Sequence, residues 1–297
     1  MEVVVLLGAG ASYGSVGVTP NPPPLGNMLF QELLKQGGVA SRLSNELRQK
    51  FEANFEDGMA AYYEETNGNI MAFQRELAEY LANFSPTEQN VYINLVRELG
   101  LESVVYSSLN YDLLFELATF QLGHPIIYSS EYTPNHVRLL KIHGSSNFWP
   151  KLSQIKLHNA QISGCGTDIE ANVGALGQDE TLRKCKGPHN EAPAMAMFAA
   201  GKKAKVCPSF IKKQYTQWKE HVTKSSKIFI VGVRVHEVDT HIWSVLGKVK
   251  GSVTYFGFEK DKIEFNQWKE NHKKKNAYFV ESDFLNSVEV IKQRCRR

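Results

Sequence analysis

The apolar residues of this chain occur either in short continuous runs or in longer stretches with a helical period. Residues 3–7, VVVLL, form a mostly β-branched run that predicts a strand buried on both faces. From about residue 27 to residue 100, apolar positions recur every three or four residues, which predicts a block of helices. Between them, residues 14–26 are rich in Gly and Pro and predict a loop. Near the end of the block, Ser85-Pro86-Thr87 predicts a helix start.

Strand-like runs return after this block. Residues 103–107, 137–142, 227–235, 252–258 and 276–280 predict strands, and the stretches after several of them, such as 110–123 and 236–249, predict helices. Strands that alternate with helices predict an α/β fold. We therefore expect a Rossmann-like, mostly parallel sheet with helices on both faces and a helical insertion after the first strand.

The whole chain, residues 1–297, is expected to form one domain of this kind. The insertion covers about residues 27–100. Residues 150–205 have scattered Gly and polar positions, which predict an irregular segment or a small subdomain.

Composition narrows the functional classes only a little. The chain is 42% hydrophobic and 22% charged with a formal net charge of +3, as in ordinary globular proteins. Its Lys and Arg clusters are short and have acidic residues nearby, which favours a solvated surface over direct nucleic-acid binding. No apolar run has the length of a membrane span, and the N-terminus lacks the pattern of a signal peptide. We expect a cytoplasmic protein with no membrane partner.

The cysteines argue against a metal. None of them forms a C-x-x-C pair, which excludes the usual pattern of a structural zinc site and of a disulfide framework. The four residues are Cys165, Cys185, Cys207 and Cys295. The sequence therefore predicts a protein without a metal cofactor.

The first candidate site is the glycine loop GAGAS, residues 8–12, directly after the first predicted strand. Such a loop lets backbone N–H groups approach phosphate oxygens without obstruction by a Cβ atom. The dinucleotide fingerprint G-x-G-x-x-G is incomplete, because Tyr13 stands where its third glycine belongs. The phosphate-binding G-x-x-x-x-G-K-[ST] pattern is also absent. Nucleotide binding and a purely structural turn both remain open for this loop alone.

Polar residues also follow two other predicted strands. Asn110 and Asp112 come after residues 103–107, and His143 comes after residues 137–142. Each has an ordinary structural explanation, since Asn and Asp commonly cap helices and a lone His is commonly structural. In a parallel sheet, however, all three strand ends meet at one edge, where ligands bind in α/β proteins. Their coincidence favours a shared site.

In this order, the motifs GAGAS, LNYD, KIHGS and IFIVGVRVHEVD resemble those of the sirtuin-like NAD-consuming superfamily. The chain is most similar to the zinc-free bacterial sirtuin-like NAD hydrolases of anti-phage defence. The form Asn110-Tyr111-Asp112 is typical of this branch, and PPPLGNMLF (22–30) is similar to its loop-to-helix entry. The two C-x-x-C pairs of zinc-bearing sirtuins and the Gly-Ile-Pro-Asp-Phe-Arg segment of deacylating sirtuins are absent.

The resemblance implies that NAD is a substrate whose pyrophosphate lies over residues 8–12. It implies that Asn110 orients the attacking water or the ribose hydroxyls and that His143 is the general base. Adenosine recognition is expected near Glu259. The full set of NAD contacts that we expect besides the catalytic pair is Gly8, Ala9, Gly10, Ala11, Ser12, Tyr111, Asp112, Ser145, Gly232 and Glu259.

The function implied is that of a NAD glycohydrolase, which produces nicotinamide and linear or cyclic ADP-ribose as a gated effector in anti-phage defence by NAD depletion. The alternatives are a protein deacylase or ADP-ribosyltransferase, and a non-catalytic NAD or ADP-ribose sensor or scaffold. The resemblance also suggests a homo-oligomer and a separate activating partner such as a ring-forming ATPase. The apolar stripes of residues 27–100 suit either plain core packing, which we favour, or oligomer contacts.

Overall fold

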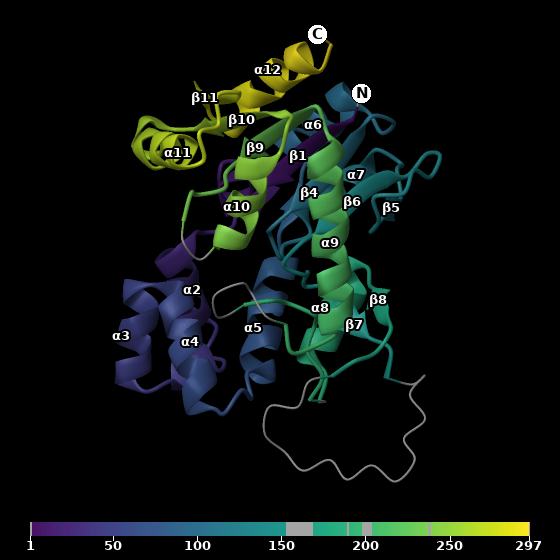
Figure 1. Cartoon of the computed structure of the whole chain (residues 1–297). Coiled ribbons are helices and arrows are strands. Elements are labelled where there is room, and N and C mark those ends of the chain that lie inside the picture. The colour runs from purple at the N-terminus through teal and green to yellow at the C-terminus, as the bar shows by residue number, and fades with distance from the viewer. Residues whose placement is uncertain (1, 153–168, 189, 198–203, 237–238, 297) are drawn as a thin grey trace.

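A seven-stranded parallel sheet forms the centre of the protein (Figure 1). The computed structural model describes residues 2–152, 169–188, 190–197, 204–236 and 239–296. The strands of the sheet are β1 (Val3–Leu7), β4 (Val104–Ser108), β5 (Ile126–Ile127), β6 (Val137–Lys141), β9 (Lys227–Val231), β10 (Ser252–Gly257) and β11 (Ala277–Glu281). Their order is β11-β10-β9-β1-β4-β6-β5, and every neighbouring pair is parallel.

Both faces of this sheet are covered, as the continuous apolar runs predicted. In β1 the side chains alternate, with Val3, Val5 and Leu7 in the core on one face and Val4 and Leu6 in the core on the other. All five are buried. The predicted α/β class, with a Rossmann-like sheet between two helical layers, is therefore confirmed.

Different helices cover the two faces. One face packs against α6 (Val91–Leu99), α7 (Leu114–Gln121) and α12 (Phe284–Arg296), together with the helices of the insertion. The other packs against α9 (Pro208–Lys224), α10 (Thr240–Lys248) and α11 (Glu259–Asn271). Trp218, Trp243 and Trp268, one from each of these last three helices, are buried in that second layer. They supply large apolar surfaces to the core.

The helical insertion lies between β1 and β4, as predicted. After a short helix α1 (Ala9–Tyr13), it contains α2 (Gly26–Lys35), η1 (Ala40–Arg42), α3 (Asn45–Ala53), α4 (Phe55–Glu65), α5 (Met71–Ala82) and α6. Figure 1 shows α2 to α5 grouped below the sheet. Phe51 stacks between Phe30 and Phe73, with ring centroids 4.6 Å and 5.3 Å apart. These rings belong to the same buried cluster as β1 and β4. The apolar stripes of the insertion that contain them therefore pack within the chain, as core.

Two local predictions differ from the structure. Ser85-Pro86-Thr87 does not start a helix, because β3 (Ser85–Pro86) pairs antiparallel with β2 (Val18–Thr19). The helix begins at Val91 instead, where the Asn90 side chain accepts a hydrogen bond from the Tyr92 N–H at 3.0 Å. The strand predicted for 227–235 ends at Val231, because Gly232 has φ 67° and leaves the extended conformation.

The later part of the chain is more regular than predicted. Residues 150–205 contribute β8 (Val173–Ala175), paired with β7 (Phe148–Pro150), and α8 (Gln178–Lys186). Cys165 lies outside the described residues. The analysis of the sequence also missed α9 and α12, although Ile211, Trp218 and Val222 in α9 recur at helical spacing and are buried. Within the described ranges, no helix is both long and apolar enough to cross a bilayer.

The stacked rings of the insertion provide a test of its role as core. Phe51→Ala removes a fully buried ring and is expected to lower the free energy of unfolding by about 3–5 kcal/mol, measured by urea denaturation. The control Phe120→Ala removes a ring that is 78% exposed and should change it by less than about 0.5 kcal/mol. A Phe51→Ala protein of unchanged stability but reduced oligomer size would contradict the core assignment.

Candidate functional site

The residues proposed from the sequence lie along the carboxyl edge of the sheet. The loops after β1, β4, β6, β9 and β10 all emerge there because the strands are parallel. From β1 the chain proceeds to β4 and β6 on one side, and it later returns to β9 on the other side of β1. The connections that follow β1 and β9 thus lead to opposite sides of the sheet, and such a switch point is where ligands bind in open α/β sheets.

The glycines of these two loops are required by close backbone contact. A Cβ atom on Gly8 would lie 2.3 Å from the Gly232 carbonyl oxygen, and one on Gly232 would lie 2.0 Å from the Ala11 nitrogen. Gly232 also has φ 67°, which an L side chain rarely adopts. The structural explanation therefore accounts for these glycines without any ligand.

The same close contact occupies backbone N–H groups of the glycine loop that we expected, from the sequence, to bind phosphate. The N–H groups of Gly8 and Gly10 donate to the carbonyls of Val231 and Gly232, and the Ala11 N–H donates to the Gly8 carbonyl, each at 2.9 Å. These three donors are already satisfied. They are therefore not available to a pyrophosphate in this conformation, and pyrophosphate binding over residues 8–12 stays a prediction. Ala9, at the start of α1, is exposed.

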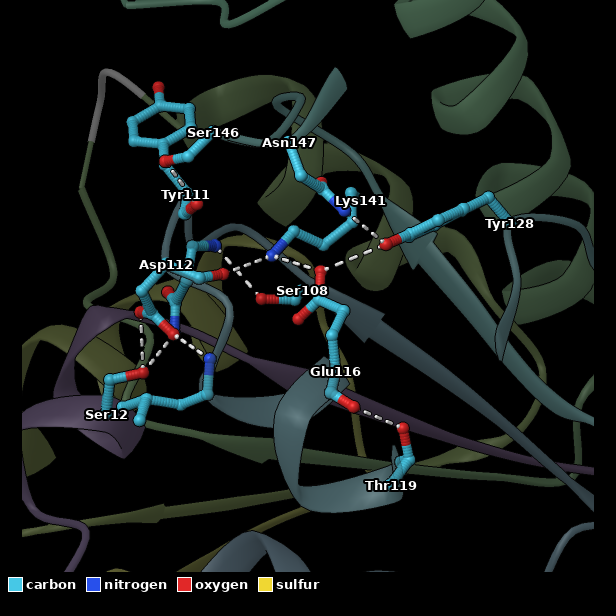
Figure 2. Close-up of polar contacts among 12 residues, drawn as sticks. Ser12, Ser108, Tyr111, Asp112, Glu116, Thr119, Tyr128, Lys141, Ser146 and Asn147 are labelled. Atoms are coloured by element: carbon cyan, nitrogen blue, oxygen red, sulfur yellow. Dashed lines mark hydrogen bonds and ion pairs between the residues drawn. The ribbon is translucent and has the colours of Figure 1, made fainter. Parts of the chain in front are cut away.

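Ser12 joins the loop after β1 to the loop after β4 (Figure 2). Its hydroxyl donates to Asp112 Oδ2 at 2.8 Å and accepts from Asn110 Nδ2 at 2.9 Å. The Tyr92 hydroxyl lies 2.8 Å from the same oxygen and must be a donor, because the single Ser12 proton is already used. Burial and the Asp112 charge raise the pKa of Tyr92 well above its ordinary value, which keeps this phenol protonated.

The Asn110 amide is held in one orientation. Its Nδ2 donates to the Gly8 carbonyl at 2.9 Å as well as to Ser12, so both of its protons are used. A carbonyl can only accept, which excludes the flipped amide. Asn110 is 7% exposed, and its Oδ1 is buried with no hydrogen-bond partner among the described residues. The buried Ser145 Oγ is in the same situation. Buried polar atoms in proteins are almost always hydrogen-bonded, so each of these two oxygens is a position for a bound water or a ligand atom.

A buried ion pair between Lys141 and Glu116 lies next to the Asn110-Tyr111-Asp112 motif (Figure 2). Lys141 Nζ lies 3.0 Å from Glu116 Oε1 and donates to the Asp112 carbonyl at 2.7 Å. Burial raises the pKa of the Glu116 carboxyl, and the Lys141 ammonium opposes that shift. Asp112 also accepts from the Leu114 N–H at 3.1 Å through Oδ1. Asp112 therefore organises the loop and the start of α7.

His143 lies in a second cluster, with side chains from the start of α10. Its Nε2 is 2.9 Å from His241 Nε2 and 3.8 Å from Asp239 Oδ1. The sequence analysis missed both partners, which are separated from His143 by nearly a hundred positions. In the sequence, the only indication was that Asp239 and His241 lie in a partly polar stretch directly after the predicted strand 227–235. Their contact depends on how α10 returns across the edge of the sheet.

The main chain around His143 is fixed by the segment 192–197. The His143 carbonyl accepts from the Ala196 N–H at 2.8 Å, and the Ser145 N–H donates to the Ala194 carbonyl at 3.1 Å. Gly144 has φ 89°, and a Cβ there would lie 2.1 Å from the Ala194 oxygen. The Tyr111 hydroxyl donates to the Ala196 carbonyl at 2.6 Å. His143 is accordingly 4% exposed.

The remaining candidate, Glu259, lies apart from the Asn110 network. It begins α11 after β10, is exposed and forms an ion pair with Lys262 at 3.2 Å. A hollow of about 450 Å³ lies beside Tyr13, the last residue of α1. Its lining consists of Tyr13, Asn21, Pro22, Pro24, Met28 and Glu32.

No protein-family profile matches this sequence, and a search of curated proteins found no significant match.

The glycine contact between the loops after β1 and β9 is testable. Gly232→Ala places a Cβ against the Ala11 backbone at a positive φ, and we expect a loss of about 2–5 kcal/mol in the free energy of unfolding. The control Gly177→Ala, at the N-cap of α8 with no atom within 4 Å of the added Cβ, should cost less than about 1 kcal/mol. Denaturant titration of both variants measures this. A fully stable Gly232→Ala protein would show that the contact is not essential.

Proposed function

We propose that this protein is a NAD glycohydrolase, which cleaves NAD to nicotinamide and ADP-ribose. The observation that carries the proposal is the fixed Asn110 amide. Its nitrogen is held by Gly8 and Ser12, and its buried Oδ1 has no donor among the described residues. A ribose hydroxyl or a water molecule can donate to this oxygen. The second buried acceptor, Ser145 Oγ, suits another polar group of the same ligand.

The chemistry requires a base as well as a positioning amide. When the bond from nicotinamide to ribose breaks, positive charge develops at the anomeric carbon, and an attacking water must lose a proton. We assign that proton to His143, because an imidazole accepts protons near neutral pH. Asp112 is already engaged with Ser12 and with the start of α7, so its role is to hold the loop.

The burial of the two catalytic candidates supports gated activity. Asn110 and His143 are 7% and 4% exposed, so little of either side chain is accessible to a ligand in this conformation. A NAD-depleting enzyme needs such control, because constant activity would be toxic to the cell. The homo-oligomer, the activating ATPase partner and the defence role stay predictions that come from the resemblance.

The hollow beside α1 suits one end of an extended NAD molecule. Pro22, Pro24 and Met28 give it an apolar lining, and Tyr13 adds an aromatic face. Apolar and aromatic surfaces of this kind bind planar rings. We propose that one of the two heterocyclic bases of NAD occupies it.

The proposal predicts specific losses of activity. Purified protein, alone and with candidate activators, is incubated with NAD and the products are separated by chromatography. Asn110→Ala and His143→Ala are each expected to lower the rate about 10²- to 10⁴-fold. The control His136→Ala lies just before β6, at the opposite end of the strand that precedes His143, and should retain full activity. Melting temperatures of all variants establish that they are folded.

Three outcomes would contradict this function. Cleavage by His143→Ala at the wild-type rate would remove the assigned base. Binding of NAD without cleavage under every condition would favour a sensor. Turnover of an acylated peptide that depends on NAD would favour a deacylase.

A further inference from the structure

His143, Asp239 and His241 form a cluster of metal-binding side chains at the edge of the sheet. His143 follows β6, and the other two lie at the start of α10. One ligand atom from each residue lies within 4.8 Å of the others. His143 is buried, whereas Asp239 and His241 are partly exposed, so the cluster is open to solvent on the α10 side.

The distances within this cluster are close to those of a metal site. Two ligands of a tetrahedral Zn²⁺ at about 2.0–2.1 Å from the metal are about 3.4 Å apart. The two Nε2 atoms are 2.9 Å apart, and His143 Nε2 is 3.8 Å from Asp239 Oδ1. Each of these two distances is within about 0.5 Å of the tetrahedral value, and the ligand atoms of all three residues lie within 4.8 Å of one another.

The hydrogen bond between the imidazoles shows what a metal ion would replace. At 2.9 Å, one Nε2 atom carries a proton that it donates to the other. A metal ion between them needs a lone pair from each Nε2 atom, so the donor ring must carry its proton on Nδ1 instead. No net proton is released from a neutral pair in this exchange.

The donors are held by regular structure. Asp239 is the N-cap residue of α10 and His241 is in its first turn. The His241 carbonyl accepts from the Tyr215 hydroxyl of α9 at 3.2 Å. The His143 carbonyl is fixed by the Ala196 N–H. Ligands on such fixed backbone need little reorganisation to bind an ion.

We propose that His143, Asp239 and His241 form an exchangeable site for a divalent transition metal such as Zn²⁺, and that an ion there inhibits the enzyme. Two imidazoles and one carboxylate suit Zn²⁺, with water completing the coordination. The inhibitory part rests on the proposed function. A His143 ring with a metal on Nε2 and a proton on Nδ1 has no lone pair left, so it cannot act as a base.

Calorimetric titration of Zn²⁺ into the protein, first treated with EDTA and then freed of it, tests the site without any assay of activity. We expect one Zn²⁺ per chain in the wild type. Loss of an outer-shell partner alone costs about 10- to 100-fold in metal affinity, so loss of a direct ligand in His241→Gln should cost at least about 100-fold. Asp239→Asn, at a partly exposed position, should also weaken binding and serves if His241→Gln does not fold.

The control His136→Gln replaces a histidine outside the cluster and should bind Zn²⁺ as the wild type does. The absence of saturable binding in the wild type, or equal binding in wild type and His241→Gln, would overturn the metal site. In the active enzyme, Zn²⁺ should inhibit NAD cleavage at the calorimetric Kd, and EDTA should reverse this. Zinc binding without inhibition would overturn the inhibitory role. If the protein does not cleave NAD at all, that result would count against the proposed function. The calorimetric result would still decide whether the metal site exists.

Discussion

The hydroxyl group of Ser12 connects the parts of the molecule on which the candidate site depends. Its one proton and its two lone pairs are all used, toward Asp112, Asn110 and Tyr92. These partners come from the loop after β4 and from α6 of the helical insertion. The atom thus links the centre of the sheet to the inserted helices. Because the Ser12 hydroxyl has no bonding capacity left over, any displacement of a partner would leave a buried polar group unpaired, which favours this one arrangement.

Close backbone packing adds a second constraint at the same edge. Gly8 and Gly10 contact Gly232, which brings together the loops after β1 and β9 at the point where the chain reverses direction along the sheet. The Gly8 carbonyl then accepts from Asn110. The glycine contact therefore sets the position of the amide whose free oxygen is the best candidate for a ligand contact. Lys141 and Glu116 complete this arrangement from the interior.

Much of the fold follows from the sequence, and part of the site does. The continuous run of β1 predicts a doubly buried strand, and the parallel sheet brings Asn110 and Asp112 near the glycine loop. The function of that loop was harder to predict, because phosphate binding and close backbone packing both require glycine. The prediction of a helix start at Ser85-Pro86 was wrong for a similar reason, because the same residues are compatible with a helix start and with a short strand. The contact of His143 with His241 depends on tertiary packing alone.

A crystal structure of the protein with ADP-ribose tests the proposed site most sharply. We expect a ribose hydroxyl to donate to Asn110 Oδ1, with Ser145 and His143 beside the same sugar. We also expect the N–H groups of Gly8, Gly10 and Ala11 to keep their present carbonyl partners while the ligand is bound. ADP-ribose bound elsewhere, with Asn110 Oδ1 still uncontacted, would show that this edge of the sheet is not the NAD site.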